Sequence, residues 1–127
     1  MQEKDLFEYA VIRIVPRVER EEFLNVGVVL YCAKQKFLKA LYKVDEKRLQ
    51  VLCSDCDVAL VKEYLNAFEQ ICNGSNNTGP IGKLPEAERF RWLTAARSTM
   101  VQTSKVHPGF CEDADEMLKK LFIQLVE

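Results

Sequence analysis

The sequence lacks an excess of charge of either sign, and it lacks any long apolar run. Its 18 Lys and Arg residues are balanced by 19 Asp and Glu residues, so the net charge is −1. This balance removes the usual electrostatic basis for binding nucleic acid or a membrane surface, although it is compatible with a local basic patch. No apolar stretch approaches the roughly 20 residues that cross a bilayer. The charged start Met1–Asp5 has no signal-peptide core behind it, so we expect a cytoplasmic protein.

The common catalytic motifs are missing as well. The chain has no glycine-rich phosphate loop, no G-x-S-x-G elbow, no H-E-x-x-H pair and no dense pair of carboxylates. These absences exclude the enzyme classes that such motifs identify. We expect no cofactor.

The five cysteines are an odd number, and most of them lie inside apolar patterns, which is typical of a reduced protein. Cys53 and Cys56 form one C-x-x-C pair, a spacing found in zinc sites and in redox pairs. His107 and Cys111 could complete a set of four zinc ligands. However, the two pairs lie far apart in the sequence, and the surroundings of the C-x-x-C pair fit a redox site only loosely. Structural or incidental cysteines, with no bound metal, are therefore favoured.

Two strands with apolar residues on both faces are predicted over Phe7–Val15 and Phe23–Cys32. Gly27 lies inside the second strand and indicates a bulge or a close approach of two backbones. A third strand over Phe37–Val44 has one polar side and follows a short turn. These three strands predict an antiparallel meander.

The rest of the chain is predicted to be mainly helical. Four helices and one strand are expected: a short helix capped by Asp45, a longer one capped by Asp55 or Asp57 and stopped by Gly74, a helical turn from Pro85 to Trp92, an extended segment over Ser98–Ser104, and a C-terminal helix with Asp113 and Glu116 as a capping box. The sequence thus predicts one α+β domain over residues 1–127. It would have an antiparallel sheet of three to four strands, with about three helices packed on it as a single pair of layers.

A first candidate site lies on and between the first two strands. It comprises Arg13, Arg17, Arg20, Glu22 and Asn25. Arg13 interrupts an apolar face, and a guanidinium held there needs partners. An internal ion pair with a carboxylate such as Glu22 is the favoured interpretation. The alternative is that Arg13 binds an anionic ligand through its planar set of donors.

A second candidate site holds the single tryptophan and the single histidine. Its members are Arg89, Trp92, Arg97, Ser98, Gln102 and His107. Such a set could hold a phosphate, or could stack a base on Trp92 with arginines on the backbone. His107 could act as a general acid or base. Alternatively, Trp92 and Phe90 anchor the core and His107 caps the loop before Pro108.

Two motifs of the chain resemble the signature of a bacterial family catalogued only as a domain of unknown function. They are YAVIRIVP at 9–16 with REEFLNVGVVL at 20–30, and ERFRWL at 88–93 with RST at 97–99, Gln102, His107 and Gly109. The family-type positions are Arg13, Pro16, Arg20, Glu22, Asn25, Gly27, Arg89, Trp92, Arg97, Ser98, Gln102 and His107. The resemblance implies no activity, substrate or cofactor. It implies a possible protein partner, because members are often encoded beside a toxin-type serine kinase.

Two functional hypotheses follow. The first is a binding module that engages a protein partner or an anionic, phosphate-bearing ligand, and it predicts that Arg13, Arg97 and His107 converge on one concave surface. The second is an enzyme acting on phosphoesters or nucleic acid, with His107 as the acid–base and an arginine stabilising charge. Binding of nucleic acid as such is not expected, nor is binding to a membrane, and the oligomeric state is not encoded in any visible pattern.

Overall fold

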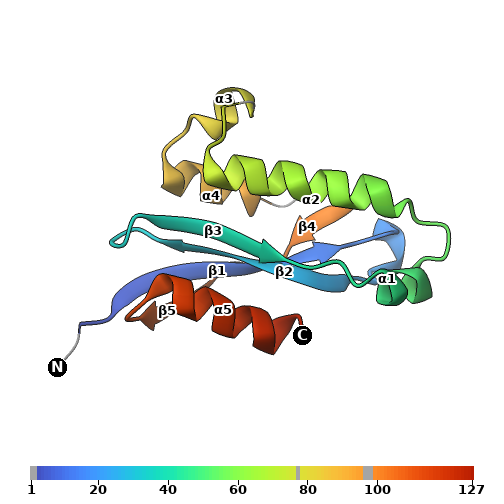
Figure 1. Cartoon of the computed structure of the whole chain (residues 1–127), viewed down its shortest axis with the longest axis horizontal. Coiled ribbons are helices and arrows are strands. Elements are labelled where there is room, and N and C mark those ends of the chain that lie inside the picture. The colour runs from blue at the N-terminus through green and yellow to red at the C-terminus, as the bar shows by residue number, and fades with distance from the viewer. Residues whose placement is uncertain (1–2, 77, 96–98) are drawn as a thin grey trace.

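The computed structural model describes residues 3–76, 78–95 and 99–127. The elements in chain order are β1 Asp5–Ile14, a 3-10 turn Val18–Arg20, β2 Leu24–Cys32, β3 Phe37–Tyr42, α1 Glu46–Leu52, α2 Val58–Asn73, α3 Gly79–Gly82, α4 Glu86–Leu93, β4 Val101–Thr103, β5 His107–Cys111 and α5 Ala114–Leu125. Figure 1 shows their arrangement, with the sheet running between helices.

The sheet is antiparallel, and β1 is its central strand. The order is β3-β2-β1-β4, and β5 also pairs with β1. β4 and β5 share the second edge of β1, where β4 pairs with Ile12–Ile14 and β5 with Asp5–Tyr9. Between them, the backbone N–H of Val11 donates to the hydroxyl of buried Ser104, and the N–H of Ser104 donates to the carbonyl of Val11 (both 2.8 Å). This exchange continues the ladder across the gap, so β4 and β5 act as one interrupted edge strand.

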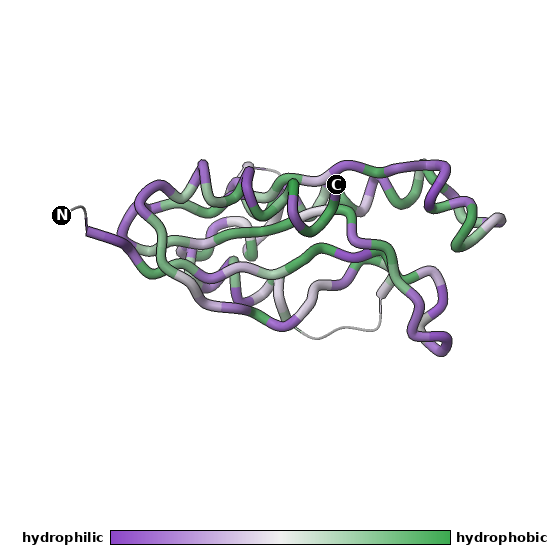
Figure 2. The backbone as a smooth tube through the Cα atoms, turned by 90° about the horizontal axis from the view of Figure 1, so that it is seen from below, coloured by the Kyte–Doolittle hydropathy of each residue, from purple (hydrophilic) through white to green (hydrophobic). Residues whose placement is uncertain are grey.

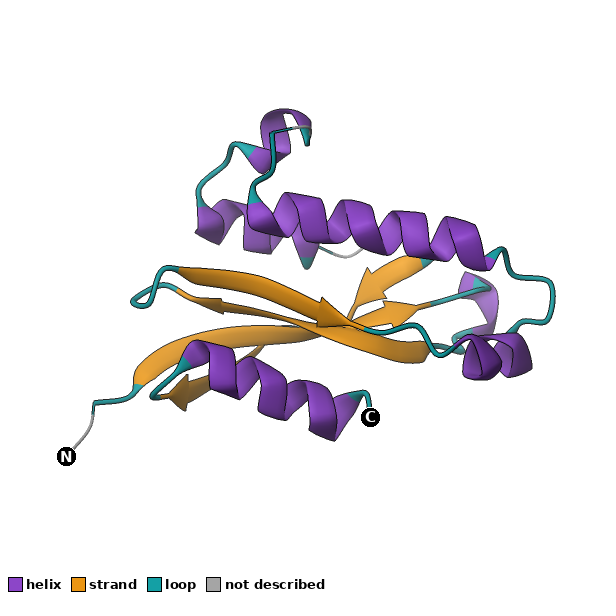
Figure 3. Cartoon of the chain, viewed as in Figure 1, coloured by secondary structure: helices purple, strands orange, loops and turns teal. Residues whose placement is uncertain are grey.

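Helices cover both faces of the sheet. In Figure 3, α2 and α4 lie on one side and α5 on the other. One buried cluster joins β1, β2 and β3 to α2 and α4, and a second joins β1, β2 and β5 to α5. The predicted α+β class with an antiparallel sheet is confirmed. The structure differs in having five strands and three layers instead of one layer pair, because β1 and β2 carry apolar side chains on both faces.

The bulge predicted at Gly27 is present. The β1–β2 register shifts by one residue between Ile12, which pairs with Gly27, and Arg13, which pairs with Asn25. A side chain at Gly27 would collide with the backbone carbonyl of Leu41 on β3. The bulge matters for the site because it places Asn25 opposite Arg13.

The predicted helix caps are confirmed at four positions. The Asp45, Asp57 and Asp113 side chains each accept hydrogen bonds from backbone N–H groups of the first helical turn. Such a cap contributes about 1 kcal/mol. Gly74 ends α2 in the left-handed conformation with φ 68°. Figure 2 shows hydrophilic and hydrophobic residues alternating along the helices, as expected for helices with one apolar face.

Strand β5 is a finding that the sequence analysis missed. Pro108 and Gly109 indicate a turn, but both lie within the strand. The outer edge of β5 has no neighbouring strand among the described residues, so a missing N–H there costs nothing. Gly109 pairs with Phe7, and a Cβ at Gly109 would lie 2.5 Å from the Phe7 ring. The two residues therefore fit an edge strand that packs against an aromatic ring.

No helix within the described ranges is both long enough and apolar enough to cross a membrane.

Candidate functional site

Arg13 is held in position by two neighbours. Its Nε–H donates to Asn25 Oδ1 at 3.4 Å, and its guanidinium carbon lies 4.1 Å from the centre of the Phe23 ring. The Asn25 amide in turn donates to the carbonyl of Leu125 at the end of α5 (3.3 Å). Phe23 is 47% exposed. A guanidinium over an aromatic face at this distance gains a cation–π attraction, which fixes its orientation at the surface.

The predicted ion pair between Arg13 and Glu22 is wrong. Glu22 pairs instead with Arg20, whose Nε lies 2.6 Å from the carboxylate oxygen. The reason is local geometry: Arg20 ends the 3-10 turn, and Glu22 follows it by two residues. Within the described part of the chain, no carboxylate forms a salt bridge with Arg13.

Gln102 and His107 lie on the same face of the sheet as Arg13. Gln102 is the cross-strand partner of Arg13, and His107 is the partner of Tyr9, with ring centres 5.4 Å apart. Directly opposed residues project to one side of a sheet, as do residues four apart on one strand. We call this set of Tyr9, Arg13, Asn25, Gln102 and His107 the Arg13 face. It lies beside α5, which packs mainly on β2 and β3.

The Arg13 face is elongated. Tyr9 and Arg13 are four positions apart on β1, a distance of about 13 Å. Arg13, Asn25 and Gln102 are half-buried, whereas His107 is exposed. A single small anion could therefore contact one end of the face, and an extended ligand could contact both.

The other members of the predicted sites lie elsewhere, and two are not described. Arg97 and Ser98 fall outside the described residues, so the predicted convergence of Arg97 with Arg13 and His107 stays a prediction. Arg17 and Arg20 lie beyond the end of β1, where they line a polar cavity of about 210 Å³ together with Glu22 and the segment Val51–Asp55. The first candidate site is thus split between two places.

Arg89 has a structural role. Its Nη1 donates to the carbonyl of Leu84 at 2.6 Å, and its guanidinium packs against Gly74, where an added Cβ would lie 3.3 Å from Cζ. Its Nε is buried and has no hydrogen-bond partner among the described residues. Arg89 therefore ties the end of α2 to the segment before α4, and it does not join the Arg13 face.

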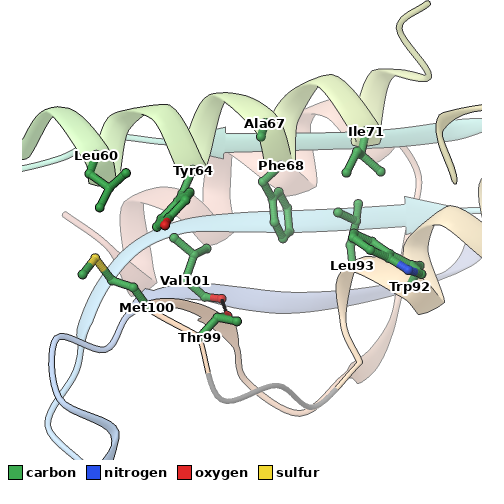
Figure 4. Close-up of a pocket in the computed structure, with 10 residues that line it drawn as sticks. All are labelled: Leu60, Tyr64, Ala67, Phe68, Ile71, Trp92, Leu93, Thr99, Met100 and Val101. Carbon is green, nitrogen blue, oxygen red and sulfur yellow. Dashed lines mark hydrogen bonds between the residues drawn. The ribbon is translucent and has the colours of Figure 1, made fainter. Parts of the chain in front are cut away.

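Trp92 lines an apolar cavity of about 460 Å³ between α2, α4 and β4. Among the described residues, its lining is uncharged and consists of Leu60, Tyr64, Ala67, Phe68, Ile71, Trp92, Leu93, Thr99, Met100 and Val101. Figure 4 shows Phe68 and Tyr64 projecting from α2 towards the side of the cavity formed by Val101. Phe90 is buried in the core, as the alternative interpretation predicted, and stacks on Tyr31 with ring centres 5.5 Å apart. Trp92 itself is half-buried and borders the cavity.

No metal-binding group is assembled in the part of the chain that the structure describes. Cys53 and Cys56 are joined in a disulfide, so the reduced state expected for the cysteines is wrong for this pair, and of the structural and incidental roles favoured from sequence the two are not incidental. They lie with Pro16 and Arg17 beyond the end of β1, whereas Cys111 pairs with Asp5 at its start. The four residues of the zinc hypothesis therefore do not form one site.

His107 has an aromatic neighbour, and the described part of the chain gives it none of the partners of a catalytic base. The Tyr9 ring is its neighbour, and no carboxylate or nucleophile within the described ranges is hydrogen-bonded to it. Acid–base catalysis needs a group oriented within hydrogen-bond reach of the transferred proton. The exposed imidazole of His107, on the edge strand β5, can donate or accept a hydrogen bond.

Two contributors to these sites were not predicted from the sequence. Phe23 lies under Arg13, and Asp55 lies beside Arg17 and Cys53. A signal for Phe23 was present, because residues two apart in a strand share a side and Asn25 was already a candidate. No sequence signal linked Asp55 to Arg17, since 38 positions separate them and only the fold brings them together.

The fold and the Arg13 face define a small α+β domain with an antiparallel sheet and a polar, arginine-containing surface on one sheet face. The chain belongs to the family described as protein of unknown function (DUF3037), whose model matches residues 9–126. It is also similar to the guanine nucleotide-binding protein alpha-8 subunit of Caenorhabditis elegans, with 36% identity over 112 residues, 86% of this chain and 29% of that protein. The chain thus spans less than a third of that relative. No solved structure matches it significantly.

Proposed function

We propose that this chain is a binding module that holds an anionic group of a partner protein, a carboxylate or a phosphate, on the Arg13 face. The observation that supports this proposal most is the state of Arg13. Its guanidinium is oriented by Phe23 and Asn25, yet it forms no salt bridge among the described residues. An arginine in this state has donors available for an external anion.

The chemistry of the guanidinium favours an oxyanion. Its planar fork matches a carboxylate or phosphate with two parallel hydrogen bonds, and such charge-assisted bonds are stronger than neutral ones. The net charge of −1 provides no general attraction for anions, so recognition would depend on the fixed donors. Since His107 lies about 13 Å along β1 from Arg13, an extended peptide of about four residues spans the face.

A purely structural role for Arg13 is the competing explanation. The chain of contacts from Arg13 through Asn25 to Leu125 could serve to anchor α5 to the sheet. The two explanations differ in what a substitution changes. A structural role predicts lost stability with unchanged binding, and the proposed role predicts the reverse.

The test is fluorescence anisotropy with labelled ten-residue peptides rich in glutamate or phosphoserine, each compared with its Gln or Ser counterpart. The protein is assayed as wild type, Arg13→Met and Arg91→Met, the last being an exposed arginine of α4 outside the face. We expect preference for the acidic peptides, weakened about tenfold (~1.4 kcal/mol) by Arg13→Met and unchanged by Arg91→Met. The proposal would be contradicted if wild type bound acidic and neutral peptides with equal affinity. It would also be contradicted if Arg13→Met and Arg91→Met bound the acidic peptides equally well.

The partner to test first is the class that the family resemblance implies, a toxin-type serine kinase, which the module would meet in the cytoplasm. Co-purification of such a kinase with wild type but not with Arg13→Met would support the assignment. Guanine nucleotide binding, suggested by the name of the similar C. elegans protein, is not part of the proposal, because the sequence has no glycine-rich phosphate loop.

A further inference from the structure

The described cysteines fall into two groups. Cys32, Cys72 and Cys111 are free thiols and are buried. Burial raises the pKa of Cys72 to about 12, and burial together with neighbouring Cys32 raises the pKa of Cys111 to about 11. Because the thiolate is the reactive form, the Cys72 and Cys111 thiols are protected from exchange, and Cys32 is shielded by its burial. Cys53 and Cys56 are half-buried and bonded to each other.

The Cys53–Cys56 bond is badly placed to stabilise the fold. It joins residues three apart in the short connection between α1 and α2. A disulfide stabilises chiefly by restricting the unfolded chain, and a loop this short restricts it little. The connection is already a turn, since the N–H of Cys56 donates to the carbonyl of Cys53 at 3.4 Å. The two Cα atoms of this turn are 5.5 Å apart, a separation at which a disulfide forms without movement of the backbone.

A carboxylate lies beside the first sulfur of the pair. Asp55 Oδ1 is 3.1 Å from Cys53 Sγ, and Asp55 Oδ2 is 3.7 Å from Arg17 Nη2. The reduced Cys53 thiol can therefore donate to Asp55, while Arg17 orients the carboxylate. Cys53 and Asp55 also line the polar cavity of about 210 Å³ that Arg17 and Arg20 border from the other side. A partner sulfur therefore has access to Cys53 from this cavity, whereas Cys56 packs against the core cluster between the sheet and α2.

We propose that Cys53 and Cys56 form a thiol–disulfide exchange site, with Asp55 as the proton acceptor of Cys53. In the oxidising direction, Cys53 gives its proton to Asp55 and its thiolate attacks a substrate disulfide. A mixed disulfide forms, and the first substrate thiolate leaves and takes the proton from Asp55. Cys56 then attacks the Cys53 sulfur, and the second substrate thiolate leaves with the Cys56 proton. Two electrons pass to the substrate disulfide, and a protein or small-molecule dithiol reverses the reaction.

Thiol counting on the full-length protein tests the site. After reduction and removal of the reductant, 4,4′-dithiodipyridine is added; this neutral disulfide avoids a charge effect from Asp55. We expect two thiols to react fast and three only after denaturation. Cys56→Ser is expected to accumulate a mixed disulfide on Cys53, located by mass spectrometry. Cys72→Ser serves as the matched control and should keep both fast thiols.

A second pair of variants tests the role of Asp55. Asp55→Asn should slow the fast phase at neutral pH by at least about fivefold, whereas Glu63→Gln, an exposed carboxylate on α2, should not change it. Titration in glutathione buffers should convert wild type between the dithiol and the internal disulfide. A bond that resists excess dithiothreitol, a pair that never oxidises, or five equally slow thiols would each overturn the exchange site. An unchanged rate in Asp55→Asn would overturn the role of Asp55.

Discussion

Arg13 and Arg89 come from the two motifs of the family signature, and their surroundings differ. Arg89 donates a short hydrogen bond to the Leu84 carbonyl, packs against Gly74 and has a buried Nε. Arg13 makes one long hydrogen bond to Asn25 and lies over an exposed ring. Membership of a motif therefore does not decide the role of an arginine. What decides it is whether the fold itself uses the donors of the guanidinium.

The largest effect is expected at Arg89. Arg89→Met removes the hydrogen bond to Leu84 and leaves that carbonyl without its partner, so the free energy of unfolding should fall by about 2–3 kcal/mol. Urea unfolding followed by circular dichroism measures this loss. Arg91→Met, two positions along α4, should lie within about 0.5 kcal/mol of wild type. An Arg89→Met protein as stable as wild type would remove the contrast between the two arginines.

A smaller loss is expected at the residue that Arg89 packs against. Gly74 has φ 68°, a conformation that costs a residue with a Cβ about 1–2 kcal/mol, and an added methyl would also press on the guanidinium. Gly74→Ala should therefore lower the urea midpoint without changing the slope. Gly79→Ala is a useful control, because φ is 69° there and no atom lies within 4 Å of the added carbon. Gly79→Ala should show the backbone cost alone, and a loss equal to that of Gly74→Ala would mean that contact with Arg89 contributes nothing.

The smallest effect is expected at Phe23. Phe23→Leu keeps an apolar side chain under Arg13 but removes the ring, so affinity for the acidic peptides should fall by about threefold, the equivalent of ~0.6 kcal/mol of cation–π attraction. Stability should stay within about 0.5 kcal/mol, since the side chain is 47% exposed. The same anisotropy assay measures the first value. A loss of stability without a loss of affinity would assign Phe23 to the fold.

Local chemistry was enough to predict much of the fold. The Asp45 and Asp113 caps, the Gly74 stop and the Gly27 bulge each follow from a residue type at one position, and all are present. The cap of α2 was predicted as Asp55 or Asp57, and the structure has Asp57. Strand β5 was not predictable in this way, because Pro108 is tolerated only through its place at a sheet edge. The caps and the bulge depend on local sequence, whereas β5 depends on tertiary contacts that the spacing of residues does not reveal.

The sequence was enough to predict which residues belong to the candidate site, but it did not predict how they are arranged in space. Arg13 stood out because it interrupts an apolar face, and the structure places Asn25, another member of the first candidate site, beside it. Their separation from Arg17 and Arg20 depends on where β1 ends and how the turn after it folds. The neighbourhood of Gln102 and His107 depends on the pairing of β4 and β5 with β1. Strand register of this kind is set by long-range packing, so the residue pattern alone does not contain it.

The central claim is that the fold uses Arg89 and leaves Arg13 for a ligand. The most direct measurement is to take Arg13→Met and Arg89→Met through urea unfolding and acidic-peptide anisotropy in parallel, with binding measured where both variants are folded. The account predicts that Arg13→Met loses about tenfold in affinity and less than about 1 kcal/mol in stability, while Arg89→Met loses stability and keeps its affinity. An Arg13→Met protein that is destabilised as much as Arg89→Met, and that binds the acidic peptides like wild type, would contradict it.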